Sequence, residues 1–345
     1  MFWQSSTLPP ILGDFMRIVL CYPVEAKHIA QIAAAMPEAE IVDAGQERIA
    51  EELFTADIFC GHAKVPVDWD GIVRQGRLKW IQSSAAGMDH CLVPSVIASD
   101  IIVTSASGVL ADQVAEHTIA LITAWTRALP TFFRAQQKKE FIRRPTRDLT
   151  RSTVGIVGLG GNGRRLVQLL APFYTRIFAT DMFPVDKPDA VEKLLPSDRL
   201  DELLPLVDIL ILALPLYAET KNLIDASTIA KMKPGALLVN MARGPLVVHD
   251  DLVAALESGH LAGAVMDVTE PEPLPPTSKL WDMPNVIITP HVGGQAAWRI
   301  ETMTDLFCRN LRRWQAKMPL INYLSDKYLG FPVRGRGYPI WGDFL

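Results

Sequence analysis

The sequence predicts an α/β fold made of two doubly wound parallel sheets. From Met16 onward, short apolar strands rich in β-branched residues alternate with segments of helical periodicity. This alternation is typical of parallel strands that are covered on both faces. The pattern runs through the chain twice, and one long helical segment, 111–137, separates the two series. A length of 345 residues also suits about two domains.

The first series lies between residues 16 and 106. Its expected strands are RIVLCYP (17–23), EIVDAG (40–45), DIFCGH (57–62), LKWIQSS (78–84) and IIVTSA (101–106). The second series follows the long helical segment, in which Pro130 is expected to kink or break the helix. Its expected strands are TVGIVGLG (153–160), RIFATD (176–181), DILILALP (208–215), ALLVNMA (236–242), AGAVMDV (262–268) and NVIITP (285–290).

The two ends of the chain lie outside these series. The last helical segment, 295–317, has no obvious place in the second series, so we expect it to cross back and pack on the first unit. Residues 1–15 precede the first strand and are interpreted as an extension. Residues 330–345 are rich in glycine, proline and aromatic residues. They predict an irregular arm, which could be either ordered or loose.

Composition argues against several functional classes. The net charge is only −4, and the absence of a basic stripe speaks against nucleic-acid binding. No apolar run reaches the roughly 18 to 20 residues that a membrane span needs. The four cysteines form no CxxC pair, and the N-terminus lacks the features of a signal peptide, so we expect a cytoplasmic protein with reduced core thiols and no metal site. The basic cluster 138–151 is interpreted as a solvated surface, with a phosphate site as the alternative.

The second series opens with the pattern Gly158-x-Gly160-x-x-Gly163, placed between an apolar strand and a helical segment. In dinucleotide-binding loops the first glycine permits a tight turn, the second lets the backbone approach a pyrophosphate, and the third packs the helix against its strand. Backbone N–H groups near Gly161 and Asn162 would then face the anion at the start of the helix. The pattern therefore predicts a dinucleotide site.

Asp181 ends the next expected strand, about 20 residues beyond the glycines. An acid at this position accepts hydrogen bonds from the ribose hydroxyls of NAD. Its negative charge would repel a 2′-phosphate, and no arginine follows it directly. We therefore predict NAD(H) as the cofactor, in preference to NADP(H).

Three polar residues, Arg243, Glu272 and His291, lie at or just after expected strand ends in the second series. Ligands of open parallel sheets bind outside these carboxyl ends, so the three side chains could meet in one crevice. Arg243 could hold the carboxylate and the carbonyl of a 2-keto acid. His291 could donate a proton to the carbonyl oxygen while a hydride reaches the carbon, and Glu272 could fix the histidine tautomer. Each residue alone suits a structural role, but their joint placement favours catalysis.

Several longer stretches cover nearly all of residues 78–295. They are LKWIQSSAAGMDH, VAEHTIALI, VGIVGLGGNG, LPLYAETKNLI, MKPGALLVNMARG, LVAALESGHLAGAVMDV, EPEPLP and PNVIITPHVGG. In this order they resemble the D-isomer-specific 2-hydroxyacid dehydrogenase family. The resemblance implies a Rossmann NAD domain inserted into a discontinuous, flavodoxin-like substrate domain. We therefore expect a substrate domain formed by 16–107 plus 296–345, an NAD domain at 108–295, and an N-terminal extension at 1–15.

The resemblance also implies roles for single residues. It implies that backbone N–H groups near Ala86 and Gly87 bind the substrate carboxylate. It also implies for Arg243, Glu272 and His291 the roles described above. Family members are usually homodimers joined through their NAD domains. Glycines after His291 would leave space for the nicotinamide ring. The full set of expected cofactor-binding residues is Gly158, Gly160, Gly161, Asn162, Gly163, Asp181, Pro215, Thr220, Asp267, Gly293 and Gly294.

The sequence predicts the reaction more closely than the substrate. A small 2-keto acid such as glyoxylate or hydroxypyruvate is expected, and phosphohydroxypyruvate, as in 3-phosphoglycerate dehydrogenases, is the alternative. A protein that senses NAD(H) without catalysis would keep the same glycine loop. A formate-dehydrogenase-like enzyme is disfavoured because those enzymes carry an amide where Glu272 stands. The chain departs from the family pattern at Gly161-Asn162, which replaces a more usual basic and aliphatic pair, and at Tyr217, where threonine is common.

Overall fold

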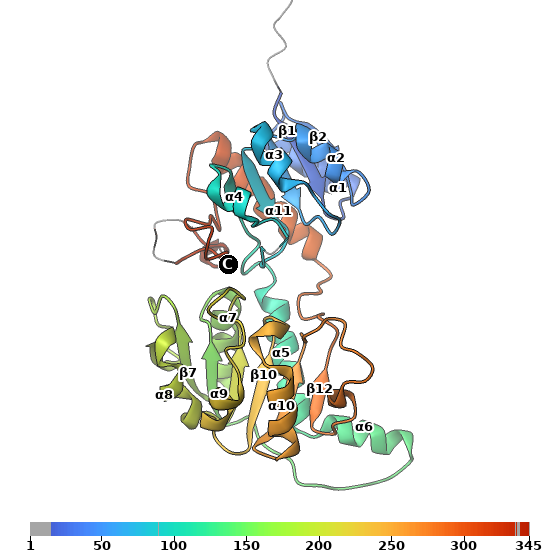
Figure 1. Ribbon diagram of the computed structural model, residues 1–345, viewed down its shortest axis with the longest axis vertical. Helices are drawn as coiled ribbons and strands as arrows, with labels where there is room; N and C mark the ends of the chain where they lie inside the picture. The colour runs from blue at the N-terminus through green and yellow to red at the C-terminus, as the bar shows by residue number, and fades with distance from the viewer. Residues whose placement is uncertain (1–14, 89, 335, 337–338, 345) are drawn as a thin grey trace, which may run out of the picture.

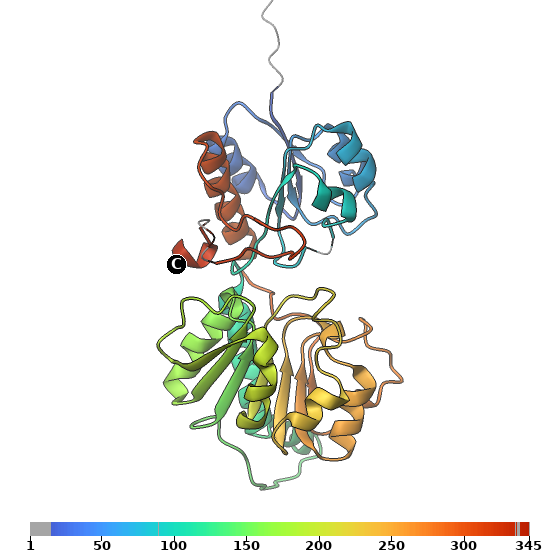
Figure 2. The ribbon, with the colours of Figure 1, turned by 60° about the vertical axis from the view of Figure 1, so that its left-hand side comes forward.

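The computed structural model describes residues 15–88, 90–334, 336 and 339–344. It contains two α/β units stacked along the long axis of the molecule, each built on a parallel sheet (Figures 1 and 2). The N-terminal extension expected at 1–15 lies almost entirely outside the described residues. No helix in the described ranges is long and apolar enough to cross a membrane.

The first unit is a five-stranded sheet with the order β2-β1-β3-β4-β5, in which every neighbouring pair is parallel. This is the strand order of flavodoxin-like folds. The strands are β1 (Arg17–Cys21), β2 (Glu40–Asp43), β3 (Ile58–Gly61), β4 (Trp80–Ser83) and β5 (Ile102–Thr104). The helices between them are α1 (Ala26–Ala35), α2 (Ile49–Glu52), α3 (Trp69–Gln75) and α4 (Pro94–Ala98). Strands β3 and β4 are buried throughout, which explains their lack of apolar–polar alternation.

The second unit is a seven-stranded parallel sheet with the order β12-β11-β10-β9-β6-β7-β8. The direction of strand addition reverses between β6 and β9, as in Rossmann folds, and ligands bind at such a reversal. The strands are β6 (Thr153–Val157), β7 (Arg176–Asp181), β8 (Val191–Pro196), β9 (Ile209–Leu212), β10 (Ala236–Asn240), β11 (Leu261–Met266) and β12 (Val286–Ile288). The helices are α7 (Gly161–Leu170), α8 (Leu200–Leu203), α9 (Ala226–Lys231) and α10 (His249–Glu257).

The long helical segment between the two series is broken, as the sequence predicts. It forms α5 (Ala111–Thr126) and α6 (Leu129–Gln137), and Ala128 between them has a left-handed backbone with φ of 55°. Pro130 lies in the first turn of α6. Proline is tolerated there because the first helical turn needs no N–H donor, whereas inside a continuous helix it would remove a hydrogen bond.

The last helix, α11 (Arg299–Gln315), returns to the first unit and packs beside α1 (Figure 1). Its buried face, which includes Leu306 and Phe307, joins the core of β1 and β4, and the ring of Phe307 lies 5.5 Å from that of Trp80. The predicted fold class is therefore confirmed: a Rossmann unit interrupts a flavodoxin-like unit formed by both ends of the chain. The exact boundaries at 16–107, 108–295 and 296–345 remain a prediction.

Candidate active site

The glycine loop leads from β6 into α7. Gly158 has φ of 95°, and a Cβ atom there would lie 2.7 Å from the carbonyl oxygen of Ala213. A Cβ at Gly163 would lie 2.2 Å from the carbonyl oxygen of Gly158, so this position also excludes a side chain. At Gly160, by contrast, an added Cβ meets nothing within 4 Å. The loop thus turns tightly and leaves open space in front of the α7 N-terminus, which suits a pyrophosphate group.

Asp181 at the end of β7 is tied to this loop. Its two carboxylate oxygens accept hydrogen bonds from the backbone N–H groups of Leu159, at 2.7 Å, and Phe183, at 2.8 Å. These bonds hold the carboxylate beside the glycine loop. A carboxylate has about four lone-pair positions, so two donors leave room for ribose hydroxyls.

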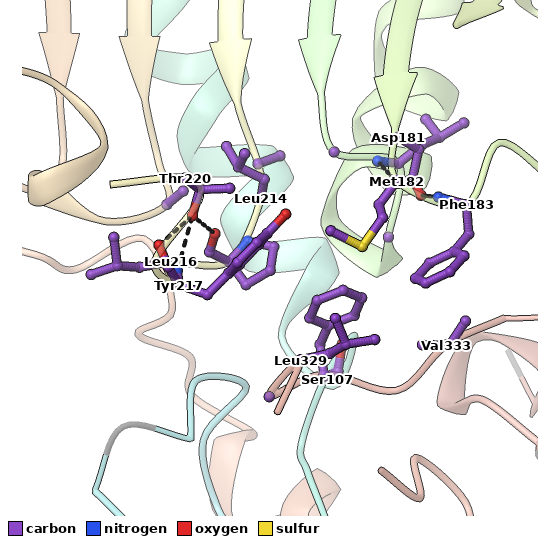
Figure 3. Close-up of a pocket in the computed structure, with 18 of the residues that line it drawn as sticks. Ser107, Asp181, Met182, Phe183, Leu214, Leu216, Tyr217, Thr220, Leu329 and Val333 are labelled. Atoms are coloured by element: carbon purple, nitrogen blue, oxygen red, sulfur yellow. Dashed lines mark hydrogen bonds between the residues drawn. The ribbon is translucent and has the colours of Figure 1, made fainter. Parts of the chain in front are cut away.

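A cavity of about 540 Å³ opens above this loop, at the reversal point of the Rossmann sheet. Figure 3 shows part of its lining, with Asp181, Met182 and Phe183 on one side and Leu214 to Thr220 on the other. The Thr220 hydroxyl donates to the Pro215 carbonyl at 2.9 Å and accepts from the Tyr217 backbone N–H at 2.9 Å, which fixes the loop after β9. The predicted site residues that line the cavity are Ala86, Gly87, Gly158, Gly160, Gly161, Asn162, Asp181, Pro215, Thr220 and Arg243.

Ala86 and Gly87 reach the cavity from the first unit, in the loop after β4. This loop is fixed through Ala85, whose N–H donates to the Ser83 hydroxyl at 3.0 Å and whose carbonyl accepts from Ala106 at 3.0 Å. The cavity is therefore bounded by both units. Ligand sites are common at such junctions between domains.

Arg243, Asp267 and His291 follow three neighbouring strands, β10, β11 and β12. Strands in a sheet lie roughly 4.8 Å apart, so the ends of β10 and β12 are about 10 Å from each other. Arg243 is half-buried, and its Nη1 donates to the Ala242 carbonyl at 2.7 Å. Only glycine fits at the next position, Gly244, because a Cβ atom there would lie 1.8 Å from the Thr269 carbonyl oxygen. The sheet therefore brings Arg243 and His291 to the same edge, as predicted.

His291 and Glu272 form a pair. The histidine Nδ1 lies 3.0 Å from Glu272 Oε2, and both side chains are close to half exposed. His291 has a left-handed backbone, with φ of 53°, which is uncommon outside glycine and is found more often at functional sites. Its N–H donates to the Asp267 carbonyl at 2.7 Å, which holds the turn in this conformation.

Asp267 braces the histidine turn through its side chain. The buried carboxylate accepts hydrogen bonds from the N–H groups of Val292 and Gly293, at 3.0 and 2.9 Å, and from the Thr289 hydroxyl at 2.6 Å. His117 on α5 adds a contact to the Thr289 hydroxyl at 3.1 Å. The direct contact with the cofactor that the resemblance implies for Asp267 remains a prediction.

Six of the predicted residues do not line the cavity: Gly163, Asp267, Glu272, His291, Gly293 and Gly294. Gly163 is buried against its strand, and Asp267 is buried beneath the turn. The other four lie on the loops beside β12, which is the edge strand, whereas the cavity is centred on β6 and β9. In this conformation the His291–Glu272 pair therefore lies to one side of the cavity.

Sequence reasoning missed one wall of the cavity. The stretch 327–334 and Ile340 line it from the C-terminal end of the chain. These residues show no helical or strand periodicity, so the sequence alone could not predict where they lie. Met182 and Phe183 were missed as well, although their place directly after Asp181 is a signal that could have found them.

Among the residues that the structure describes, no group of three or more histidine, cysteine or acidic side chains is arranged to hold a metal ion. Cys21, Cys60, Cys91 and Cys308 are all buried. Burial raises the pKa of the Cys21 thiol to about 11, so it is protonated at neutral pH. These thiols belong to the core.

Comparison with known proteins identifies the chain. A family described as "D-isomer specific 2-hydroxyacid dehydrogenase, NAD binding domain" matches residues 119–293. The chain belongs to this family. The dehydrogenase is accordingly an oxidoreductase of 2-hydroxy acids that uses a nicotinamide cofactor.

Relatives of this dehydrogenase act on different small acids. A glyoxylate reductase of Thermofilum pendens is 37% identical over 245 residues, which cover 68% of this chain and 71% of the relative. The D-3-phosphoglycerate dehydrogenase of Bacillus subtilis is 33% identical, over 74% of this chain but only 49% of its own length. The solved structure of a D-isomer specific 2-hydroxyacid dehydrogenase from Xanthobacter autotrophicus, in complex with NADPH and MES, has a TM-score of 0.77 at 28% identity. That match covers 92% of this chain and 99% of the other.

Proposed function

We propose that this dehydrogenase reduces a small 2-keto acid of the glyoxylate or hydroxypyruvate class with NADH, and that His291 is its acid–base residue. The observation that carries the proposal is the His291–Glu272 pair at 3.0 Å, on the same sheet edge as Arg243. The likeness to a glyoxylate reductase supports the substrate class. Glu272, rather than an amide, supports a reaction in which a carbonyl oxygen receives a proton.

Each residue has a distinct task in this proposal. Arg243 binds the substrate carboxylate and carbonyl oxygen through its planar guanidinium group. When bound, the cofactor supplies a hydride to the carbonyl carbon. The Glu272 carboxylate accepts a hydrogen bond from the Nδ1–H group of His291, so Nε2 is the atom that donates a proton to the carbonyl oxygen. Because the imidazole is 46% exposed, solvent can return this proton after each turnover.

Ala86 and Gly87 would grip the substrate carboxylate from the first unit. A closure of the two units would bring this loop, Arg243 and His291 around one substrate and exclude water from the hydride transfer. Two segments join the units, before α5 and before α11 (Figure 2), and they would form the hinge of such a closure.

NAD(H) is proposed in preference to NADP(H) because the Asp181 carboxylate is fixed beside the glycine loop, where it would repel a 2′-phosphate. The relative from Xanthobacter autotrophicus was solved with NADPH, so the preference needs a direct test. The ratio of kcat/KM with NADH to that with NADPH decides it. A ratio above one is expected, and it should fall in Asp181→Ser.

A substrate phosphate is not favoured by the basic cluster 138–151. Arg147 in this cluster donates to the Gly235 carbonyl at 2.7 Å, directly before β10, and the cluster runs into β6. It therefore lies at the amino ends of the strands, at the far end of the molecule from the cavity (Figure 1). Homodimerisation through the NAD domains is also part of the proposal, and sedimentation of the purified protein would test it.

The function is tested by following NADH oxidation with glyoxylate, hydroxypyruvate, pyruvate and phosphohydroxypyruvate. We expect the highest kcat/KM with glyoxylate or hydroxypyruvate, and a lower value when hydroxypyruvate carries a phosphate. A higher value with phosphohydroxypyruvate would overturn the substrate class. Tight NADH binding without turnover on any of the four would instead favour a sensing protein.

A further inference from the structure

The C-terminal arm, which we define as residues 323–334, 336 and 339–341, crosses from the first unit to the mouth of the cavity. It begins beside β5, where Tyr323 forms an antiparallel bridge with Thr104 and the Leu324 N–H donates to the Val103 carbonyl at 3.0 Å. Its middle part, 327–334, lines the cavity opposite the Rossmann sheet. The arm is thus a segment of one unit that faces the ligand edge of the other.

The arm is fixed to the first unit before the part that faces the cavity. The Lys327 ammonium group donates to the carbonyl oxygens of Val96, Ser99 and Ile101, around the end of α4. Partial burial lowers the pKa of Lys327. Three carbonyl acceptors around one ammonium group satisfy all of its donors, so this anchor holds the backbone firmly.

The arm is fixed a second time after the part that faces the cavity. The Asn322 N–H donates to the Pro339 carbonyl at 2.9 Å, and the Asn322 side-chain oxygen accepts from the Trp341 N–H at 3.0 Å. Trp341 is 3% exposed and belongs to the core of the first unit. The described residues between the two anchors, 328–334 and 336, therefore belong to a segment that is anchored at both ends, which we call the strap.

The strap contacts both sides of the crevice above the glycine loop. The Phe331 ring lies 6.5 Å from that of Tyr217, in the loop after β9. The Arg336 guanidinium lies over the Phe183 ring at 5.6 Å, in the loop after β7. Strands β7 and β9 flank β6, so these two aromatic contacts span the point where the strand order reverses.

Apolar side chains lie on both faces of the space between strap and sheet. Figure 3 shows Leu329 and Val333 on one side, facing Met182 and Phe183 on the other. Val333 is only 4% exposed, although it lies on a segment without regular structure. An adenine ring offers two flat apolar faces, and its ribose would lie near the polar Asp181. The chemistry of the space therefore matches an adenosine group.

From these contacts we infer that the C-terminal arm is the outer wall of the binding site for the adenosine half of the dinucleotide. The inference rests on the proposed function only in requiring that a dinucleotide binds. In this arrangement Phe331 and Val333 cover the adenosine, and Arg336 closes the mouth by stacking. The nicotinamide half, nearer Arg243 and His291, would not depend on the arm.

The test measures binding rather than turnover. Calorimetric titration gives the dissociation constants of NADH, ADP-ribose and reduced nicotinamide mononucleotide for the parent chain and for Phe331→Ala/Arg336→Ala. Phe331 is half-buried and Arg336 is exposed, so the fold should persist. The matched control is Phe141→Ala/Arg143→Ala, because Phe141 is 94% exposed in the basic cluster, far from the cavity.

We expect the arm variant to bind NADH and ADP-ribose at least tenfold more weakly and the mononucleotide with unchanged affinity. The control should match the parent for all three. Equal binding of ADP-ribose by parent and arm variant would overturn the inference alone. Equal weakening for all three ligands would also overturn it, because the arm would then act on the whole site. A parent that does not bind NADH would contradict the proposed function as well.

A second readout uses the arm's own cleavage sites. Arg334 and Arg336 lie on the arm beyond its Lys327 anchor, so trypsin can cut it there. Saturating ADP-ribose should slow cleavage at Arg334 and Arg336 of the parent several-fold and should not slow cleavage at Arg334 in the arm variant. Cleavage at an unchanged rate with ADP-ribose, in a parent that binds it, would count against the arm as a wall.

Discussion

Two histidine sites in this dehydrogenase differ in the environment that surrounds the ring. His291 is about half exposed, has a carboxylate 3.0 Å away and is held in a left-handed backbone. His90 is stacked on His62 at 3.9 Å, and burial, together with the charge of His62, lowers its pKa to about 3. The His291 ring is open to proton exchange with solvent, whereas burial keeps the His90 ring neutral inside the fold.

The difference shows that the environment of the ring decides the role of a histidine. His90 lies beside the loop that carries Ala86 and Gly87, yet its environment excludes acid–base work at neutral pH. His291 has the accessible ring and the orienting carboxylate that a proton donor needs. Substitution of His291 should therefore affect activity, and substitution of His90 should affect stability.

The largest expected effect follows His291→Ala. Loss of the proton donor should lower kcat by about a hundredfold to ten-thousandfold. The free energy of unfolding should change little, because the side chain is exposed and no core contact is lost. Steady-state kinetics and chemical denaturation of the same preparation check both statements. Normal kcat in this variant would remove His291 from the mechanism.

Glu272→Gln should have a smaller effect on activity. The amide keeps the shape but loses the charge that orients and stabilises the imidazolium, so kcat should fall about tenfold to hundredfold. The loss is expected to be smaller than in a buried triad because solvent screens this pair. NADH affinity, measured by titration, should stay unchanged. A large loss of NADH binding would show that Glu272 acts on the cofactor site instead.

His90→Gln should change the response of stability to acid. The folded pKa of about 3 lies below the ordinary value of 6.5, so the unfolded chain binds more protons between these values. The contribution of His90 to the free energy of unfolding is therefore complete above pH 6.5. It is lost as the pH falls, by up to about 1.4 kcal/mol per pH unit. Urea unfolding at several pH values should show that the free energy of unfolding falls less steeply with decreasing pH in the variant than in the parent. An equally steep loss in the variant and in the parent would contradict this expectation.

The smallest effect is expected at His117. Its ring is partly exposed and lies 3.1 Å from the Thr289 hydroxyl that supports the His291 turn. His117→Leu should lower the free energy of unfolding by about 0.5 to 1.5 kcal/mol, the usual net value of one hydrogen bond. A denaturation midpoint measures this loss. A decrease in kcat as large as that of His291→Ala would place His117 in the chemistry itself.

Much of the fold and of the candidate site was predictable because parallel strands put their ends at one edge. Once the apolar strands were recognised, Arg243 and His291 had to lie at the same edge of the sheet, and the glycine spacing located the start of α7. These predictions depend on local pattern and on a fixed sheet geometry. They needed no knowledge of side-chain contacts.

Other features depend on tertiary contacts that no local pattern encodes. The position of the C-terminal arm follows from Lys327 meeting three carbonyls near α4 and from Trp341 entering the core. The bracing role of Asp267 follows from the pairing of β11 with β12, which sets its distance to the Gly293 N–H. Neither partner can be read from sequence spacing alone.

The most direct test of the account is the configuration of the product. Parent enzyme, hydroxypyruvate and NADH should yield glycerate that chiral chromatography identifies as the D isomer alone. His291→Ala should bind NADH as tightly as the parent and form almost none of this product. D-glycerate formed at the parent rate by His291→Ala would contradict the claim that this histidine is the acid–base residue, and L-glycerate as the product would contradict the D-isomer specificity of the family.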